Sequence, residues 1–267
     1  MTTIDLNSDL AEGYGAYRCG DDEAMLSIVT SANVACGLHA GDPEIMARAF
    51  AVARERGVAV GAHPGFPDLW GFGRRRIPFS TGEIERLVAY QIGAAAALAA
   101  YAGHKITYVK PHGALGNISC EERPVADAIV RAIRAVDPTL CLLATALTAQ
   151  VAAGEAAGLT VHQEIFADRG YTEEGQLVAR HLPGAMISDA QEAADRVVAM
   201  VREGALITLS GRRLPTPIRS ICVHSDSSHA VEMARRVRAA LEEAGIALAP
   251  FAPATLAPVP RAAAASA

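Results

Sequence analysis

The segment Ile106-Thr-Tyr-Val-Lys-Pro-His-Gly113 joins a short strand pattern to two ionisable side chains and a glycine. Its β-branched and aromatic residues predict a buried strand. Lys110 and His112 then stand at the carboxyl end of that strand. Apolar runs that end in a polar group recur along the chain, and their alternation with helical patterns decides the fold class.

Short β-branched runs alternate with longer helical patterns along the chain. Strands are predicted near Ile4–Asn7, Ala32–Cys36, Val58–His63, Ile106–Lys110, Leu140–Ala144, Thr160–Phe166, Ser220–His224 and Ile246–Ala249. This alternation predicts parallel strands that are joined by helical crossovers. About seven or eight such units in a chain of 267 residues favour a closed α/β barrel of the TIM type. An open doubly wound sheet is the alternative fold.

The helices carry recognisable cap signals, and one segment interrupts the alternation. The predicted caps are Asp42 before Pro43, a capping box of Ser80 with Glu83, and a second box of Ser188 with Gln191. Two prolines and a glycine within Leu206–Arg219 indicate a small β-arm inserted near residues 205–219. We expect residues 1–256 to form a single barrel domain and the Ala/Pro-rich residues 257–267 to be a disordered tail.

The composition and the absent motifs argue against several classes of protein. The formal net charge is −5 and no long basic patch occurs, so nucleic acid is not an expected partner. The longest apolar run, Ile92–Ala102, is shorter than the roughly 20 residues of a spanning helix, so no membrane partner is expected. Five widely spaced cysteines suggest reduced thiols in a cytoplasmic protein. Walker-type, GxSxG and HExxH motifs are absent, which disfavours a serine hydrolase or a zincin.

Polar residues follow nearly every predicted strand. They are Asn7, Asp9, His39, His63, Lys110, His112, Glu164, Asp168, Arg169, His224 and Asp226. In a parallel barrel these strand ends lie on one face, where active sites are built. Glycines in the same loops permit close approach of a ligand to the backbone. The sequence therefore predicts one pocket at this face.

Two questions about this pocket stay open in the sequence. Lys110 follows an apolar strand, so we expect it to be buried with Glu164 as its partner. This pair could be a structural salt bridge, or Lys110 could be a catalytic residue. Asp9, His39, His63 and His112 are candidate metal ligands from separate strands, although no pair of them has the close spacing of a local metal motif.

Several long segments resemble the LamB/YcsF family. They are Asp5-Leu-Asn-Ser-Asp-Leu-Ala-Glu12, Ser31–Pro43, Gly61–Arg75, Val109-Lys-Pro-His-Gly-Ala-Leu115, Glu164–Arg169 and Ile221-Cys-Val-His224. The resemblance covers Asp5 to about Pro250 and implies a distorted β/α barrel similar to glycoside hydrolases and deacetylases. One departure is His224-Ser-Asp226, where the family tends to read His-Gly-Asp.

The resemblance also implies an activity, namely the ATP-dependent hydrolytic opening of 5-oxo-L-proline to L-glutamate together with partner subunits B and C. ATP would be a co-substrate whose main site lies on a partner or is shared with one. We expect catalytic roles for Asp9, His63, Lys110, His112 and Glu164. We expect substrate or phosphate binding by Asn7, Asn33, His39, Asp168, Arg169, His224 and Asp226. The alternatives are a metal-dependent carbohydrate deacetylase and a non-catalytic substrate-binding subunit.

Overall fold

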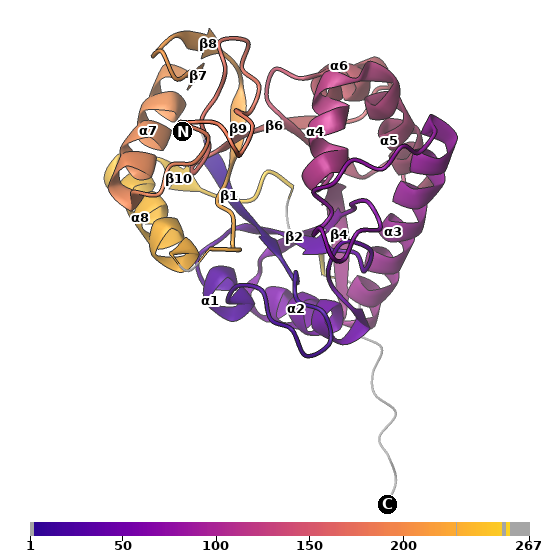
Figure 1. Cartoon of the computed structure of the whole chain (residues 1–267). Coiled ribbons are helices and arrows are strands. Elements are labelled where there is room, and N and C mark those ends of the chain that lie inside the picture. The colour runs from indigo at the N-terminus through magenta and orange to yellow at the C-terminus, as the bar shows by residue number, and fades with distance from the viewer. Residues whose placement is uncertain (1–2, 228, 253–254, 257–267) are drawn as a thin grey trace, which may run out of the picture.

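The computed structural model describes residues 3–227, 229–252 and 255–256, and the expected tail at 257–267 lies outside the described residues. Strands and helices alternate along most of the chain (Figure 1). In order they are β1 (Thr3–Leu10), α1 (Asp22–Leu26), β2 (Ser31–Ala35), α2 (Pro43–Arg56), β3 (Ala59–His63), α3 (Thr81–Tyr101), β4 (His104–Val109), α4 (Gly113–Glu121), α5 (Arg123–Val136), β5 (Cys141–Thr145), α6 (Ala149–Ala156), β6 (Val161–Phe166), α7 (Ala190–Glu203), β7 (Ala205–Ile207), β8 (Arg213–Pro215), β9 (Ile218–Cys222), α8 (Ala230–Glu243), β10 (Ala247–Leu248) and β11 (Thr255–Leu256).

Seven of the described strands close into a ring in the order β1-β2-β3-β4-β5-β6-β9, with β9 pairing back onto β1. Every pairing in the ring is parallel. The predicted β/α barrel is therefore confirmed, and the open doubly wound sheet is wrong.

The last predicted strand lies beside the ring and not in it. β10 pairs with Thr3 and Ile4 at the start of β1. Farther along β1, Asp5–Asn7 already pair with Ser220–Cys222 of β9. Because this pairing closes the ring, no position remains in it for an eighth strand.

The inserted arm is present but shorter than predicted. β7 and β8 form an antiparallel hairpin outside the barrel. The predicted limit near residue 219 is wrong, because Ile218 already pairs with Gln163 of β6. The strand predicted at Ser220–His224 accordingly begins earlier and ends at Cys222.

Two of the three predicted helix caps form as expected. The side chain of Asp42 accepts hydrogen bonds from the first backbone N–H groups of α2, and Gly57 ends that helix with φ 67°. Ser80 and Glu83 make the reciprocal capping box of α3.

The third predicted cap, Ser188 with Gln191, is wrong by one residue. Asp189 caps α7, and its carboxylate accepts a hydrogen bond from the backbone N–H of Glu192. A carboxylate also complements the positive end of the helix dipole, which a serine hydroxyl does not.

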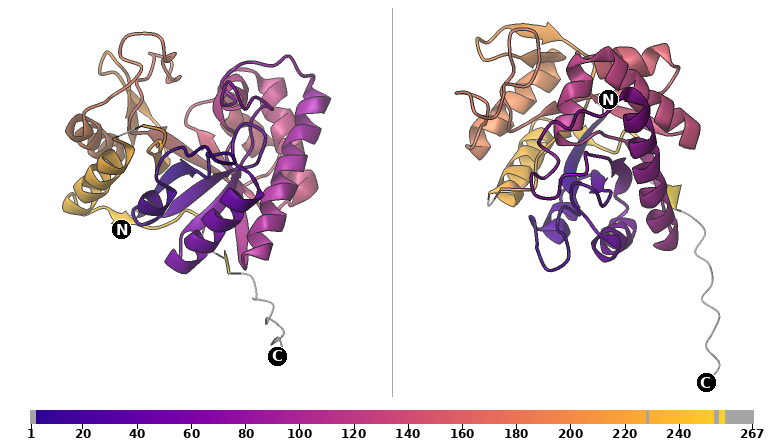
Figure 2. Two further views of the ribbon diagram at one scale, coloured as in Figure 1. Left: turned by 60° about the horizontal axis from the view of Figure 1, so that its bottom comes forward. Right: turned by 45° about the vertical axis from the view of Figure 1, so that its right-hand side comes forward.

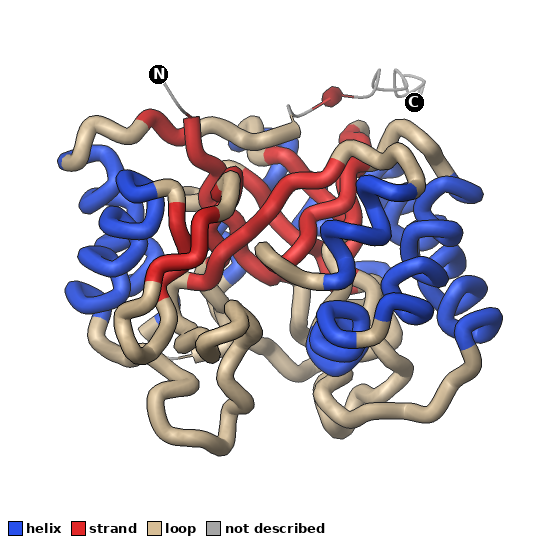
Figure 3. The backbone as a smooth tube through the Cα atoms, turned by 90° about the horizontal axis from the view of Figure 1, so that it is seen from above, coloured by secondary structure: helices blue, strands red, loops and turns tan. Residues whose placement is uncertain are grey.

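The helices form a layer around the barrel (Figure 2). α3 packs against α5, and α7 packs against α8. Long loops gather at the end of the barrel opposite the start of β1, which is the carboxyl-terminal end of its strands (Figure 3). Among the described residues, no helix combines the length and apolar character needed to cross a membrane.

Gly61 lets two neighbouring strands approach at the centre of the barrel. A Cβ atom at this position would lie 2.3 Å from Cε2 of Tyr108. The Tyr108 ring is fully buried, and its hydroxyl donates a 2.7 Å hydrogen bond to Oδ1 of Asn33. The ring is thus held in place by a polar contact as well as by packing.

A Gly61→Ala substitution should therefore destabilise the fold by about 1–3 kcal/mol through overpacking. Gly93→Ala is a matched control, because Gly93 is exposed in α3 and its added Cβ meets nothing within 4 Å. The control should be neutral or stabilising by up to about 1 kcal/mol. Chemical denaturation measures both variants, and equal stabilities would contradict the packing argument.

Candidate functional site

The Lys110 ammonium lies at the centre of the polar strand ends. Its Nζ atom is 3.0 Å from Oδ1 of Asp9 and 3.1 Å from Oε2 of Glu164. It also lies 3.1 Å from Sγ of Cys222. Lys110 is only 3% exposed, so these contacts replace its hydration. The predicted pairing of Lys110 with Glu164 is present. Asp9 is a second acidic partner of the same ammonium.

The backbone of Lys110 is fixed by β3. Its N–H donates a 2.9 Å hydrogen bond to the carbonyl of Ala62, and its own carbonyl lies 2.7 Å from Nδ1 of His63. The lysine and the histidine are therefore positioned relative to one another by adjacent strands.

Amide side chains support this group from inside the barrel. Asn33 donates to Oδ1 of Asn7 at 2.7 Å and to Oδ1 of Asp9 at 2.8 Å. Asn7 in turn donates to Oε2 of Glu164 at 3.3 Å. Both asparagines are buried and lie behind the ionisable residues. They orient the carboxylates, because an amide offers donors in a fixed direction.

Asp5 lies deeper on the same strand, below the pocket. Its carboxyl group accepts hydrogen bonds from the hydroxyls of Thr30, Ser31 and Ser220. Burial nevertheless raises the pKa of Asp5 to about 6.

His63 and His112 each turn one ring nitrogen toward the other ring. Nδ1 of His63 lies 2.7 Å from the carbonyl of Lys110, and Nε2 of His112 lies 2.8 Å from the carbonyl of Phe72. A carbonyl can only accept, so each of these nitrogens carries a proton. The other two nitrogens, Nε2 of His63 and Nδ1 of His112, face one another at 3.1 Å.

Carboxylates flank this histidine pair. Oδ2 of Asp9 is 3.4 Å from Nε2 of His63, and Oε1 of Glu12 is 3.5 Å from Nδ1 of His112. Oε1 of Glu12 is buried and has no hydrogen-bond partner among the described residues. A buried oxygen of this kind indicates a missing proton, water or ion.

Burial acts on these carboxylates with different results because their neighbours differ. Burial alone would raise the pKa of Asp9, but His63 and Lys110 outweigh it and hold this pKa well below its usual range. Burial and then the Asp9 charge raise the pKa of Glu12 well above its usual range. Burial also raises the pKa of Glu164, against the opposing effect of Lys110. The site therefore combines one carboxyl group with a lowered pKa, Asp9, and two with raised pKa values, Glu12 and Glu164.

The same neighbours set the charges of the cation and of one histidine. Burial would lower the pKa of Lys110, but Asp9, then Cys222 and Glu164, raise it well above its usual range. Burial and then His63 lower the pKa of His112 to about 3. At neutral pH, Lys110 is charged and His112 is a neutral ring.

Four of these residues fit a divalent metal. One ligand atom each from Asp9, Glu12, His63 and His112 can be chosen so that all four lie within 4.8 Å of one another. Backbone carbonyls fix both imidazoles with their free nitrogens inward, as in the outer shells of metal sites. The predicted candidate His39 is not in this group, and its ring stacks on His112 with centroids 3.7 Å apart.

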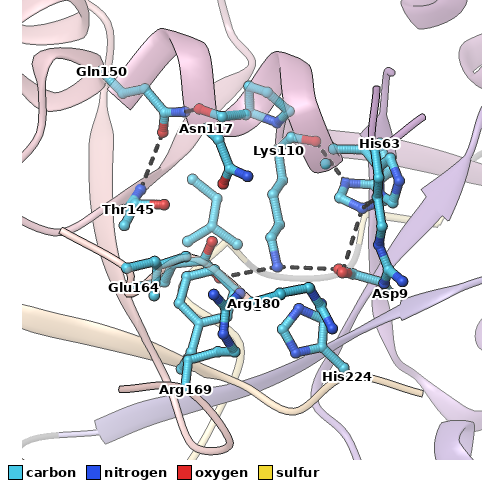
Figure 4. Close-up of a pocket in the computed structure, with 18 of the residues that line it drawn as sticks. Asp9, His63, Lys110, Asn117, Thr145, Gln150, Glu164, Arg169, Arg180 and His224 are labelled. Atoms are coloured by element: carbon cyan, nitrogen blue, oxygen red, sulfur yellow. Dashed lines mark hydrogen bonds and ion pairs between the residues drawn. The ribbon is translucent and has the colours of Figure 1, made fainter. Parts of the chain in front are cut away.

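The site opens into a cavity of about 270 Å³ at the carboxyl ends of the strands (Figure 4). Its walls combine residues predicted to be catalytic or binding with side chains that the sequence did not single out. The predicted lining residues are Asp9, His63, Lys110, His112, Glu164, Arg169 and His224, and the additional ones include Glu12, Arg74, Asn117, Thr145, Gln150 and Arg180.

The other predicted binding residues contact the walls from outside the cavity. Nδ1 of His224 lies 2.7 Å from Oδ2 of Asp168. Asp226 lies 2.6 Å from Nη2 of Arg74. The loop after β9 keeps both polar contacts, although it lacks the glycine that the family tends to carry.

These features define the class of the protein. It is a distorted parallel β/α barrel with a preformed, charged pocket at the carboxyl ends of its strands. The chain belongs to the LamB/YcsF family, whose model matches residues 4–256. The resemblance found in the sequence is thereby confirmed.

Named relatives match along nearly their whole length. A protein of Azorhizobium caulinodans, named as the A subunit of 5-oxoprolinase, is 66% identical over 253 residues, which cover 95% of this chain and 100% of the relative. A protein of the same name from Gluconobacter oxydans is 61% identical, covering 92% of this chain and 97% of the relative.

Solved structures agree with this assignment. The lactam utilization protein of Thermus thermophilus is 44% identical and superposes with a TM-score of 0.89, covering 94% of this chain and all of that one. The catalytic domain of a peptidoglycan N-acetylglucosamine deacetylase from Eubacterium rectale has a TM-score of 0.50 at 11% identity, covering 97% of each chain. That second likeness shows a shared barrel fold alone.

Asp5 makes a pH-dependent contribution to stability. Its pKa in the fold is above the unfolded value of about 3.9, so between pH 4 and pH 6, roughly, the native state binds more protons than the unfolded state. The free energy of unfolding should therefore fall as pH rises through this window, by at most about 1.4 kcal/mol per pH unit. An Asp5→Asn variant should lose this component. Denaturation curves at several pH values measure it, and an unchanged slope would contradict the raised pKa.

Proposed function

We propose that this chain is the lactam-opening component of a 5-oxoprolinase. The observation that supports this most is the buried Lys110 ammonium, held between two carboxylates at a small cavity, in a chain whose relatives are named as the A component of that enzyme. The substrate would be 5-oxo-L-proline and the product L-glutamate.

A lactam is a stable amide, so its opening needs stabilisation of negative charge on the carbonyl oxygen. Lys110 offers a preorganised ammonium to that oxygen, or to a phosphoryl group carried by it. Asp9 and Glu164 hold the ammonium in position through the contacts described above, and Oδ1 of Asn7 accepts a further hydrogen bond from its Nζ at 3.3 Å. Water is largely excluded at this depth, which strengthens the electrostatic effect of the charge.

Water must also be activated for attack on the ring carbon. Asp9 is the carboxylate that stays ionised, and His63 lies beside it with a free Nε2. These two groups can accept the proton of water as general bases. The pKa of Glu12 is raised well above its usual range, so this residue can donate a proton to the leaving ring nitrogen. A divalent ion bound by Asp9, Glu12, His63 and His112 would supply Lewis-acid polarisation of that water.

ATP would be consumed together with partner subunits B and C. The word "subunit" in the names of the relatives supports an assembly, and the chain carries no Walker-type phosphate loop. We therefore place the main nucleotide site on a partner or at a shared interface.

Lys110→Met keeps the bulk of the side chain and removes its charge. In an assembly reconstituted with partner subunits, we expect glutamate formation to fall by ~10²-fold or more, because one preorganised charged group is lost. The melting temperature should also fall, since two buried carboxylates lose their cation.

Lys105→Met is the matched control, because Lys105 lies on the same strand and is exposed. It should leave turnover and melting temperature unchanged. Near-normal turnover of the Lys110 variant would remove Lys110 from the catalytic group, whatever its melting temperature.

The chain alone should not couple ATP to the reaction. We expect no ADP release on addition of ATP and 5-oxoproline to the isolated chain, and release of both ADP and glutamate once partner subunits are added. Partner subunits without this chain are the control. Robust ADP formation by the isolated chain would contradict this division of labour.

A further inference from the structure

A buried chain of hydrogen bonds runs from the cavity to a carboxyl group deeper in the barrel. Its members, in order from the deepest, are Asp5, Ser220 and Asn7, followed by Lys110 and Glu164 at the cavity. Figure 4 shows the last two side chains meeting in the cavity. The first three are buried and do not line it. Any effect of these three on a ligand must therefore pass through Lys110 and Glu164.

Ser220 links Asp5 to Asn7 and gives the chain of hydrogen bonds a direction. Burial raises the pKa of Asp5 to about 6, so at neutral pH its carboxyl group is mostly ionised and can only accept. The single hydroxyl proton of Ser220 is donated to Oδ2 of Asp5, which leaves only lone pairs on Oγ. The second partner of Ser220 must accordingly be a donor. Asn7 meets this requirement, because its Nδ2 donates to Oγ at 2.7 Å.

This direction fixes the side-chain amide of Asn7. Its Nδ2 also donates to Oε2 of Glu164 at 3.3 Å. Its Oδ1 accepts from Nζ of Lys110 at 3.3 Å and from Nδ2 of Asn33 at 2.7 Å. A flipped amide would place its NH₂ group against two other donors and its oxygen against a carboxylate. It would also leave Oγ of Ser220 without a donor, so only one orientation satisfies every neighbour.

Glu164 depends on this amide for its own orientation. Within the part of the chain that the structure describes, its carboxylate has two polar side-chain contacts, Asn7 at 3.3 Å and Lys110 at 3.1 Å. An amide donates in a fixed direction, whereas an ammonium on a flexible stem does not. Without Asn7, a single flexible cation would set the orientation of the Glu164 carboxylate.

We propose that Ser220 is a positioning residue for the ring-opening reaction, because it fixes Asn7 and, through Asn7, the relative placement of Glu164 and Lys110. This inference rests on the proposed function. Ser220 does not line the cavity, so its loss should lower kcat and leave KM nearly unchanged. A serine that only stabilised the fold would not produce this split.

Ser31 of β2 provides a matched control. Its hydroxyl donates to the other carboxyl oxygen of Asp5, Oδ1, at 2.6 Å, and it is as deeply buried as Ser220. Among the hydrogen bonds of the described residues, however, none joins the Ser31 side chain to Asn7. Ser31→Ala and Ser220→Ala therefore both remove a hydroxyl donor from Asp5, and only Ser220→Ala releases the amide.

Steady-state kinetics of the reconstituted assembly compare the two variants. Ser220→Ala should lower kcat for glutamate formation by about tenfold, because misplaced reacting groups slow a reaction strongly. Ser31→Ala should keep kcat close to that of the wild-type chain, although both variants should have lower melting temperatures. Equal losses of kcat in the two variants would overturn the proposal, since support of Asp5 would then explain the effect. An unchanged kcat in Ser220→Ala would overturn it as well.

Ser220→Cys is a second variant for the case in which Ser220→Ala does not fold. A thiol keeps the approximate shape of the serine side chain but is a weak donor and a weak acceptor. This variant should therefore also lower kcat, by a smaller factor than Ser220→Ala, and leave KM nearly unchanged. A folded Ser220→Cys chain with the kcat of the wild type would contradict the proposal.

Carbon-13 NMR of the isolated chain measures the positioning of Glu164 without any partner subunit. Burial raises the pKa of Glu164, and the hydrogen bond from Asn7 is among the contacts that oppose this rise. Release of the amide in the Ser220 variants should therefore raise the pKa of Glu164 further, whereas Ser31→Ala should leave it unchanged. The spectrum of a Glu164→Gln variant assigns the signal. An unchanged pKa of Glu164 in both Ser220 variants would overturn the proposal.

The two measurements can fail independently of one another. If the wild-type assembly forms no glutamate, the proposed function is refuted, and the titration of Glu164 still tests its link to Ser220. If the assembly is active and the Ser220 variants retain their kcat, the proposed function stands and the positioning role is refuted.

Discussion

The structure of the pocket depends on one buried ammonium group. Lys110 is almost inaccessible to water, and it remains charged only because Asp9 and Glu164 lie within 3.1 Å of it. The two carboxylates in turn require the asparagine amides behind them. Each part of this group would be destabilising if buried alone, so the residues constrain one another.

The closed parallel barrel makes this mutual arrangement possible. Asp9 and Lys110 are 101 positions apart in the chain, yet their strands end at the same face as the strand of Glu164. Short distances between them follow from strand register and need no flexible loop. Helices and loops supply the rest of the cavity wall, and Arg169 donates hydrogen bonds to two carbonyls of its own loop. The site thus combines a rigid floor with a loop-built rim, which is a common arrangement in barrels.

The strands and the strand-end residues could be predicted from the sequence, because both leave local signals. Apolar runs that end in His, Lys or Asp are visible without coordinates. Glu12 was not among the predicted site residues, since nothing local reveals that its carboxyl group turns toward His112. Gln150 and Arg180 stand outside the predicted strand ends, and only the packing of loops and helices brings them to the cavity. The N-cap of α7 shows a similar limit. Ser188 and Asp189 are adjacent and both are residue types that cap helices, so the sequence alone does not decide which of them caps α7.

The histidine pair has a consequence for how this pocket can change over time. Both outer ring nitrogens are held by main-chain carbonyls, of Lys110 and of Phe72. A main-chain acceptor survives replacement of the side chain that it belongs to. The proton positions of the two rings therefore depend on the backbone at the end of β4 and in the loop after β3, and not on particular side chains there. Descendants of this chain could change side chains of the rim, and with them the ligand, while the inward-facing nitrogens stayed available to new chemistry as long as the backbone path was kept.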